Sequence, residues 1–477
     1  MKHAASWIAT DRTAIFATGM KPPLRSVVCL LFSVLCHLSS VQAGTIVAGP
    51  MLGNQAHREA FIWVETKDAR KVTLDYWLAG RPDTKQSLTK TDLRTTPAGG
   101  QISHFRPGLL EMGAQYEYAL SIDGEPQRFP YPLTFKTTTL WEWRTPPPDF
   151  KFIFGSCAYF NDPAYDRPGP GYGKTMETFR LMGDSGADFM VWGGDNWYFR
   201  EPDYSSESGL WYRAQRDRAL PELKKLFAVM PHYATWDDHD YGSNDSNKSF
   251  EFKDETLRIF KAYWGNPTYG EEDNPGVYTK FAWGDAEFIL MDDRSYRDDD
   301  LLDERSAPGP LKTQYGARQR DWLKQSLVHA QKEGHATFKF IVTGGQVLTD
   351  FGGASETFAY YQAEREDLLK FIKDQHISGV VFLTGDVHFT ELARKKLTDT
   401  QLVYELTSSP FSSGTWAGAL TERKADPHRV EGTQVVDQNF CTLALHGPKD
   451  ERVLSIACID KQGVTRWTHD IKAAELK

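Results

Sequence analysis

Hydrophobic and polar positions follow two different patterns along this chain, and the first occupies residues 44 to 140. Short runs rich in aromatic and β-branched residues recur there, at Ala60–Glu65, Val72–Leu78 and Tyr116–Ile122. Segments rich in Gly, Pro and Asp separate these runs at the spacing that is typical of a small sandwich. The pattern predicts an all-β, immunoglobulin-like domain over residues 44–140.

The pattern changes after a proline-rich joint, Trp141–Pro148. Compact apolar runs now alternate with helix-like stretches, which is typical of strands buried on both faces within an α/β domain. We predict this domain over residues 141–477. The expected strands are Lys151–Phe154, Phe189–Trp192, Tyr233–Trp236, Glu287–Met291, Lys339–Val342 and Gly379–Leu383. The expected helices are Gly173–Met182, Leu220–Ala228, Arg318–His329 and Arg365–Asp374.

The first 43 residues have the pattern of a secretory signal peptide. Lys21 and Arg25 precede an apolar run at residues 26–36, and Val41-Gln42-Ala43 gives a small-residue cleavage pattern before Gly44. A short membrane anchor is the alternative, although the run is short for a bilayer. Met20 stands just before the charged residues, so translation can also start there. We expect a secreted or periplasmic protein without another membrane span.

Charge and cysteine content narrow the picture further. The net charge of −9 argues against a protein that grips nucleic acid through a broad basic surface. If Cys29 and Cys36 leave with the signal, three cysteines remain. Cys441 and Cys458 stand symmetrically about a predicted hairpin turn at Gly447–Asp450, so they could form a disulfide. Cys157 is then a single thiol in an oxidising compartment, and such a thiol calls for an explanation.

Polar and metal-capable residues follow nearly every predicted strand of the α/β domain. In open α/β sheets, functional groups gather beyond the carboxyl ends of the strands. Taken singly, each residue has an ordinary structural interpretation, such as a buried thiol, a turn aspartate or a solvated acidic loop. The strand-end segments are Gly155–Tyr159, Gly193–Tyr198, Trp236–Asp240 with Asn244 beyond, Asp292–Arg294, Gly344–Gln346 and Gly385–His388.

Taken together, these segments indicate a metal centre. Several carboxylates that converge on one point repel one another unless a cation neutralises them. Carboxylates suit hard cations, whereas Cys thiolate, Tyr phenolate and His favour a transition metal. Two kinds of site are therefore expected, one for iron and one for calcium or a similar ion.

The same motifs resemble the alkaline phosphatase D family of calcineurin-like metallophosphoesterases. They occur in the family's order between about residues 150 and 390, and the β-domain before them also resembles that family's N-terminal sandwich. Two features depart from the pattern: Ser156-Cys157 replaces the wider superfamily's Asp-x-His motif, and the signal lacks paired arginines. The motifs are Gly-Ser-Cys157, Gly-Asp195-x-x-Tyr198, Trp-Asp-Asp238-His239-Asp, Asp292-Asp-Arg294 and Gly-Asp386-Val-His388.

This resemblance implies a fold and a set of ligands. The fold would be a metallophosphoesterase-type β-sheet sandwich flanked by helices. Asp195 would bridge an Fe³⁺ site to a second site for Ca²⁺ or another divalent ion. The implied Fe³⁺ ligands are Cys157, Asp195, Tyr198 and His388, and those of the second site are Asp238, Asp386 and, less securely placed, Asn244. Arg294 would bind phosphate oxygens, with a sheet-end ion pair as its alternative role. His239 would stand beside the leaving group, with a structural hydrogen bond as its alternative.

The expected activity is hydrolysis of phosphodiesters, phosphomonoesters or both, through attack by a metal-bound hydroxide. The substrate would be a small molecule, a phospholipid head group or a polymer. Three segments, Ser205–Arg218, Asp350–Tyr361 and Ser408–Arg429, are long, irregular or aromatic-bearing and could cover the site. Two other classes remain open: a calcium-stabilised extracellular binding protein, and a catalytically silent relative that only binds phosphate.

Overall fold

A computed structural model describes residues 44–303, 312–332, 336–351, 356–423 and 426–477 of the chain. The predicted signal segment lies outside these residues. The described residues belong to one compact unit. Within the described ranges, no helix combines the length and the hydrophobicity that a bilayer span requires.

The N-terminal part is all-β, as predicted. Alternate residues of its central strand β6 are buried, which is the pattern of a sheet with one face on a core. A three-stranded sheet has the order β1-β2-β5, and a second has the order β4-β3-β6-β7 with β8 also paired to β6. The strands are β1 (Thr45–Gln55), β2 (Ala60–Lys67), β3 (Val72–Leu78), β4 (Gln86–Lys90), β5 (Gln101–Phe105), β6 (Gln115–Ile122), β7 (Glu125–Pro126) and β8 (Thr134–Lys136). The domain boundary near residue 140 remains a prediction.

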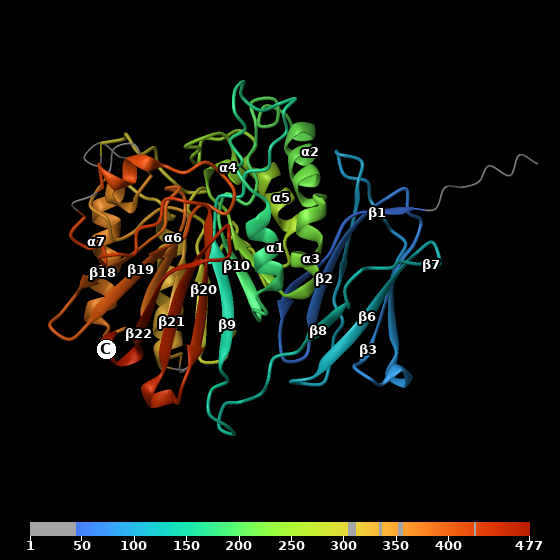
Figure 1. The fold of residues 1–477 in the computed structure, drawn as a ribbon, viewed down its shortest axis with the longest axis horizontal. Coiled ribbons are helices and arrows are strands. Elements are labelled where there is room, and N and C mark those ends of the chain that lie inside the picture. The colour runs from blue at the N-terminus through green and yellow to red at the C-terminus, as the bar shows by residue number, and fades with distance from the viewer. Residues whose placement is uncertain (1–43, 304–311, 333–335, 352–355, 424–425) are drawn as a thin grey trace, which may run out of the picture. The chain divides into compact units, whose positions relative to one another are not determined.

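Two six-stranded sheets form the centre of the α/β part (Figure 1). Their strand orders are β11-β10-β9-β20-β21-β22 and β14-β15-β16-β17-β19-β18. The six predicted strands all form: β9 (Phe150–Gly155), β10 (Phe189–Gly193), β11 (His232–Thr235), β15 (Ala286–Leu290), β16 (Phe338–Val342) and β17 (Val380–Thr384). The others are β14 (Thr279–Trp283), β18 (Glu391–Lys396), β19 (Leu402–Thr407), β20 (Asn439–His446), β21 (Val453–Asp460) and β22 (Thr465–Lys472), with a small β12 (Gly270–Glu271) and β13 (Asn274–Pro275) pair.

Phenylalanine side chains fill the space between the two sheets. Phe152 of β9 stacks on Phe189 at 5.2 Å between ring centroids and meets Phe340 of β16 edge-on at 5.3 Å. Each of these side chains is buried, as part of one apolar cluster drawn from both sheets. Because a sheet in this position is covered on both faces, its strands need continuous apolar runs, which is the signal that the sequence shows.

Helices cover the outer faces of both sheets. One set packs on the β9–β11 side around Trp192 and Phe227, and the other packs on the β15–β17 side around Leu327 and Ile372. The α-helices are α1 (Glu177–Asp184), α2 (Glu207–Arg218), α3 (Lys224–Val229), α4 (Asp238–Tyr241), α5 (Lys253–Tyr263), α6 (Gly316–Lys332) and α7 (Gln362–Asp374). The sandwich flanked by helices confirms the predicted fold class.

One helix was not among those expected. Residues 205–218 were described as a long, irregular or aromatic-bearing segment, and Glu207–Arg218 is the helix α2, whose N-terminus is capped by the Oγ atom of Ser206, which accepts from Gly209 N–H at 3.2 Å. Apolar periodicity is weak because α2 buries Arg213, Asp217 and Arg218 together with its apolar residues. A charged inner face hides the pattern on which sequence-based prediction of a helix depends.

Two predicted helices begin later than expected. α1 starts at Glu177, because residues before it are held extended by other contacts, including Lys174 N–H to Ser412 O at 2.7 Å. The stretch from Leu220 opens as a 3₁₀ turn at Pro221–Leu223 and becomes α3 at Lys224. Proline has no N–H to donate and suits the first position of such a turn.

The predicted hairpin around Gly447 forms between β20 and β21. Gly447 has a φ of 90°, which a glycine adopts without strain. Cys441 and Cys458 lie directly opposite each other in the register of these strands, and both are buried free thiols. Their oxidation to a disulfide remains a prediction.

Candidate metal centre

The polar residues after the central strands share an unusual backbone conformation. Cys157 follows β9, Asp195 follows β10, and Asp386 and His388 follow β17; their φ angles are 62°, 54°, 62° and 56°. Residues other than glycine rarely adopt this left-handed backbone conformation, and such backbone strain is found most often at functional sites. All four are predicted metal ligands.

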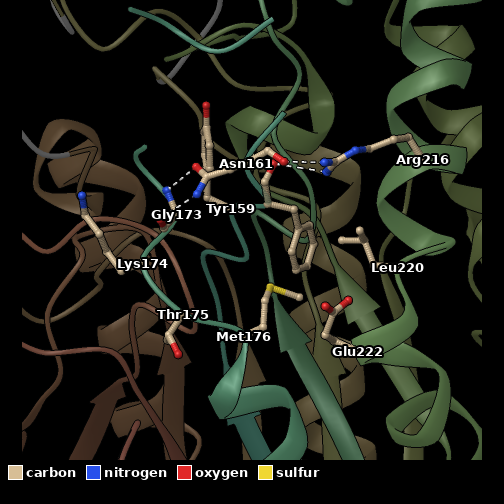
Figure 2. Close-up of a pocket in the computed structure, with 10 residues that line it drawn as sticks. Tyr159, Asn161, Gly173, Lys174, Thr175, Met176, Arg216, Leu220 and Glu222 are labelled. Carbon is tan, nitrogen blue, oxygen red and sulfur yellow. Dashed lines mark hydrogen bonds between the residues drawn. The ribbon is translucent and has the colours of Figure 1, made fainter. Parts of the chain in front are cut away.

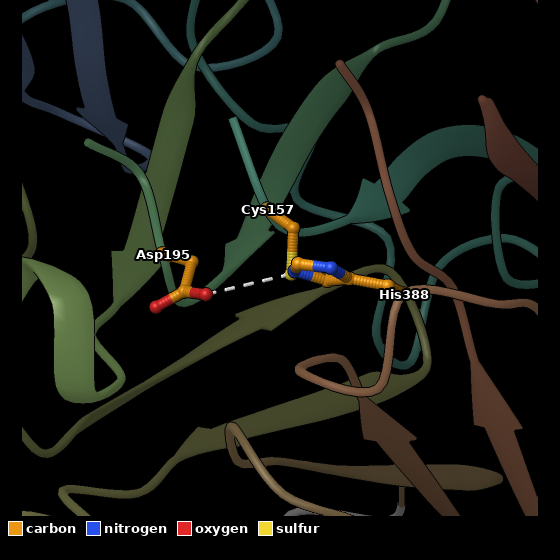
Figure 3. Close-up of side chains that lie close together, drawn as sticks. All are labelled: Cys157, Asp195 and His388. Carbon is orange, nitrogen blue, oxygen red and sulfur yellow. Dashed lines mark hydrogen bonds between the residues drawn. The ribbon is translucent and has the colours of Figure 1, made fainter. Parts of the chain in front are cut away.

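The predicted Fe³⁺ ligands converge at this edge of the sandwich (Figure 3). One donor atom each from Cys157, Asp195 and His388 lies within 4.8 Å of the others. Tyr198 joins them, because its hydroxyl donates to Asp195 Oδ2 at 2.8 Å and lies 3.2 Å from His388 Nε2. We call these four residues the first cluster.

Two further clusters continue from the first, and each shares one residue with the cluster before it. Asp195, Asp238 and His239 form the second cluster, and Asp237, Asp238 and Glu356 form the third; within each, donor atoms again lie within 4.8 Å of one another. Asp195 is therefore shared by the first two clusters and Asp238 by the last two. A carboxylate shared in this way can bridge two cations through its two oxygens.

The electrostatics of the clusters fit cations. Burial raises the pKa of Asp195 well above its usual range, and the negative charge of Asp238 adds to this effect. Burial, followed by the charge of Asp195, likewise raises the pKa of the Cys157 thiol. Burial lowers the pKa of His388 to about 4, which keeps its imidazole neutral and able to bind a metal. A bound cation reverses the penalty on the acids, because it stabilises their anionic forms.

Unpartnered polar atoms point to the same conclusion. Oδ1 of Asp238 and Oδ2 of Asp237 are buried and accept no hydrogen bond from the part of the chain that the structure describes. A buried oxygen without a donor is costly, and a metal ion removes that cost. The donor set also fits the two expected ions, since a thiol, a phenol and an imidazole lie around the first cluster and carboxylates dominate beyond it.

Asp240 holds the two ligand-bearing loops together, a role that the sequence did not suggest. Its carboxylate accepts from the backbone N–H groups of Asp195, Asn196 and Asp237 at 3.3, 3.2 and 2.6 Å. These groups belong to the loops after β10 and β11. The signal was present as the last residue of the Trp-Asp-Asp-His-Asp segment, but only the fold shows which N–H groups it meets.

Arg294 lies beside the clusters and is completely buried. Its Nε donates to Asp237 Oδ1 at 2.7 Å, and its Nη1 and Nη2 donate to the two oxygens of Glu356 at 2.9 and 2.6 Å. The structure therefore shows the ion-pair alternative, and a role in binding phosphate remains a prediction. Glu356 was not recognised from the sequence, because no motif surrounds it.

The remaining predicted ligands lie at the edge of the clusters. Burial, followed by the charges of Glu356 and Asp238, raises the pKa of Asp386 well above its usual range, but its carboxylate is not among the donor atoms that form the three clusters. Its backbone carbonyl accepts from Cys157 Sγ at 3.6 Å. Asn244 is exposed, and its neighbour Asp245 donates a backbone N–H to Asp238 Oδ2 at 2.8 Å.

His239 is placed at the border between the clusters and the surface. Its ring packs on Tyr198 at 4.2 Å between centroids, its Nε2 lies 3.9 Å from Asp238 Oδ2, and 22% of its side chain is exposed. Its backbone N–H donates to Asp195 Oδ1 at 3.2 Å. The ring can therefore face either an ion or a bound ester.

Two of the segments that were expected to cover the site do reach it. Trp416, from the segment after β19, donates its backbone N–H to the His388 carbonyl at 3.1 Å, and Glu356 belongs to the segment before α7. Tyr159 also lines a pocket of about 380 Å³, to whose apolar lining Met176 and Leu220 contribute (Figure 2).

The paired sheets, the flanking helices and the strand-end clusters define a metallophosphoesterase-like fold. Comparison with solved structures agrees: PhoD superposes with a TM-score of 0.67 and 17% identity, covering 88% of this chain and 91% of that chain. Purple acid phosphatase PPD1 from yellow lupin seeds superposes with a TM-score of 0.63 and 11% identity, covering 90% of this chain and 74% of that chain.

The family follows from the sequence comparison. The PhoD-like phosphatase family profile matches residues 152–450, and the chain belongs to this family. It is similar to alkaline phosphatase D of Bacillus subtilis (strain 168), with 26% identity over 342 residues. That match covers 62% of this chain and 56% of the Bacillus protein, so the chain spans little more than half of that relative.

Proposed function

We propose that this protein is an exported, metal-dependent phosphoesterase that hydrolyses phosphodiesters, phosphomonoesters or both. The observation that carries the proposal is the pair of ligand clusters that share Asp195, in a chain of the PhoD-like phosphatase family. Two adjacent cations are the arrangement that many phosphate-ester hydrolases use. The substrate is a phosphate ester of a small molecule, a lipid head group or a polymer.

The first cluster would hold Fe³⁺ through Cys157, Asp195, Tyr198 and His388. The second site would hold Ca²⁺ or another divalent ion through Asp195 and Asp238, with Asp386 and Asn244 as further candidates. The donor chemistry supports this division, because thiolate and phenolate favour a transition metal and carboxylates favour a hard cation. When bound, such a pair activates water and neutralises charge on the phosphate group.

The protein side chains would orient the ester and manage a proton. His239 is the partly exposed ring next to Asp238, so we assign it the proton that passes to the departing oxygen. Arg294 fixes the carboxylates of Asp237 and Glu356, and a bound phosphate would have to compete with them for the guanidinium. Any direct contact between Arg294 and substrate therefore requires Glu356 to move.

Metal analysis of the purified protein, together with an absorbance scan, tests the proposal. A tyrosinate–iron(III) centre gives a visible charge-transfer band, whereas a protein that binds only calcium is colourless. Hydrolysis of bis-p-nitrophenyl phosphate and of p-nitrophenyl phosphate then measures diesterase and monoesterase activity. A metal-loaded protein that cleaves neither compound would be a silent phosphate-binding relative, and a colourless, iron-free protein would be a calcium-stabilised binding protein.

The role of His239 has its own test. We expect His239→Gln to lower kcat by about 100-fold or more, with a larger effect on esters of poor leaving groups, because general-acid catalysis matters most there. The metal content should be unchanged. Loss of metal from this variant would instead make His239 a ligand of the second cluster.

A further inference from the structure

Tyr172 makes a contact with His388 that neither the motifs nor the family match assigns. Its hydroxyl lies 2.7 Å from His388 Nδ1, on the opposite side of the imidazole from Nε2, which faces Tyr198. The two residues are 216 positions apart. Tyr172 belongs to the segment Gly169–Gly173, which follows the Cys157 loop and precedes α1.

The packing around Tyr172 fixes its ring in this place. A Cβ atom at Gly414 would lie 2.7 Å from Cε2 of Tyr172, so the ring rests directly against a glycine backbone. Its other neighbour is Tyr159, which meets it edge-on at 5.0 Å between centroids. Although 42% of Tyr172 is exposed, the ring therefore has a defined position.

The contact with Tyr172 bears on which nitrogen of the His388 imidazole carries the proton. A neutral imidazole carries one proton, so a ring that offers its Nε2 lone pair to a metal must carry that proton on Nδ1. Nδ1–H then needs an acceptor. A histidine that binds a metal almost always donates its other ring N–H to a neighbouring group that does not itself touch the metal. The phenol oxygen of Tyr172 is at the right distance to accept it.

We propose that Tyr172 is a positioning residue for the first cluster: it accepts the Nδ1 proton of His388 and so directs Nε2 towards Cys157 and Asp195. The inference rests on the metal centre described under the proposed function. A neutral phenol in this position adds no charge to the imidazole.

The test uses full-length mature protein loaded with Fe³⁺ and carrying Tyr172→Phe. This change keeps the ring against Gly414 and Tyr159 but removes the acceptor. We expect iron retention against graded EDTA to weaken by about 10- to 100-fold, the usual effect of losing such a partner. The visible band should shift or weaken, and the thermal midpoint should change little.

Tyr165→Phe is the matched control, because Tyr165 also lies between β9 and α1, is similarly exposed and packs on Tyr212 instead of His388. It should retain iron as the wild type does. If Tyr172→Phe also retains iron and keeps the wild-type band, the proposal for Tyr172 is wrong while the metal centre stands. If the wild type itself binds no iron, the proposed function fails first.

Discussion

Two groups of buried carboxylates lie in this molecule, and they are neutralised in different ways. Around α2, arginines meet the acids directly: Arg213 Nε lies 2.7 Å from Asp203, Arg216 Nη1 lies 2.7 Å from Asp217, and Arg200 Nε lies 3.0 Å from Asp166. We call this group the arginine cluster. Asp162 also belongs to it, through Arg213 at 3.3 Å.

The strand-end clusters contain more acid than base. Asp195 and Asp238 lie there with Asp237 and Glu356, and of these four acids Arg294 pairs with the last two. A guanidinium occupies fixed directions and fills the space between carboxylates. Among the strand-end acids, one oxygen of Asp237 and one of Asp238 accept no hydrogen bond from the described chain. A buried acid cluster in which some carboxylates have no arginine partner is thus the one to examine for a metal.

The largest expected effect comes from Asp195→Asn. This change removes the charge that two clusters share, so both metals should be lost. The value of kcat/KM should fall by more than about 100-fold, which exceeds the usual loss when only a hydrogen-bond partner of a metal ligand is removed. Elemental analysis and the ester assays measure both effects. Asp203→Asn, an equally buried change in the arginine cluster, is the control and should leave the metal content intact. Full activity in Asp195→Asn would overturn the two-metal proposal.

Arg213→Met tests the other group. The guanidinium is fully buried between Asp162, Asp203 and Asp217, so its loss should lower the free energy of unfolding by about 3–5 kcal/mol. Urea titration measures the loss. Arg216→Met serves as comparison, since its side chain is 23% exposed and the loss should be smaller. The folded fraction of either variant should bind metal normally; if it does not, the two groups are coupled.

Glu65 is a buried acid that is neutralised in a third way, by keeping its proton. Its replacement has the smallest expected effect. Burial raises its pKa from 4.5 to about 7, and the hydrogen bonds from Gln215 and Tyr263 only partly oppose this. Between these pH values the folded protein holds a proton that the unfolded chain releases, so stability falls as pH rises through this range. Glu65→Gln keeps the neutral shape at all pH values.

We therefore expect Glu65→Gln to be more stable than the wild type by about 1–3 kcal/mol above pH 7, with the difference vanishing towards pH 4.5. Thermal or urea unfolding at several pH values measures this. Glu59→Gln is the control, since it makes the same change close by in the sequence at a side chain that is 45% exposed. A difference that is constant across pH would mean that Glu65 is ionised in the folded protein.

Much of the fold could be predicted because its signals are local. All six expected strands of the α/β part form, since strands covered on both faces require continuous apolar runs. The four expected Fe³⁺ ligands come together because parallel strands bring their carboxyl ends to one edge. The helix α2 was missed because its buried face carries the charged residues Arg213 and Asp217, so the local apolar signal is absent.

By itself, then, the sequence determined which segments become strands and which polar residues follow them, because both depend on neighbours along the chain. Only the tertiary structure decided which distant groups meet at those strand ends. Glu356 reaches Arg294 across 62 positions, and Tyr172 reaches His388 across 216. No local pattern records such contacts, since they depend on the order of strands in two sheets and on the path of the loops between them.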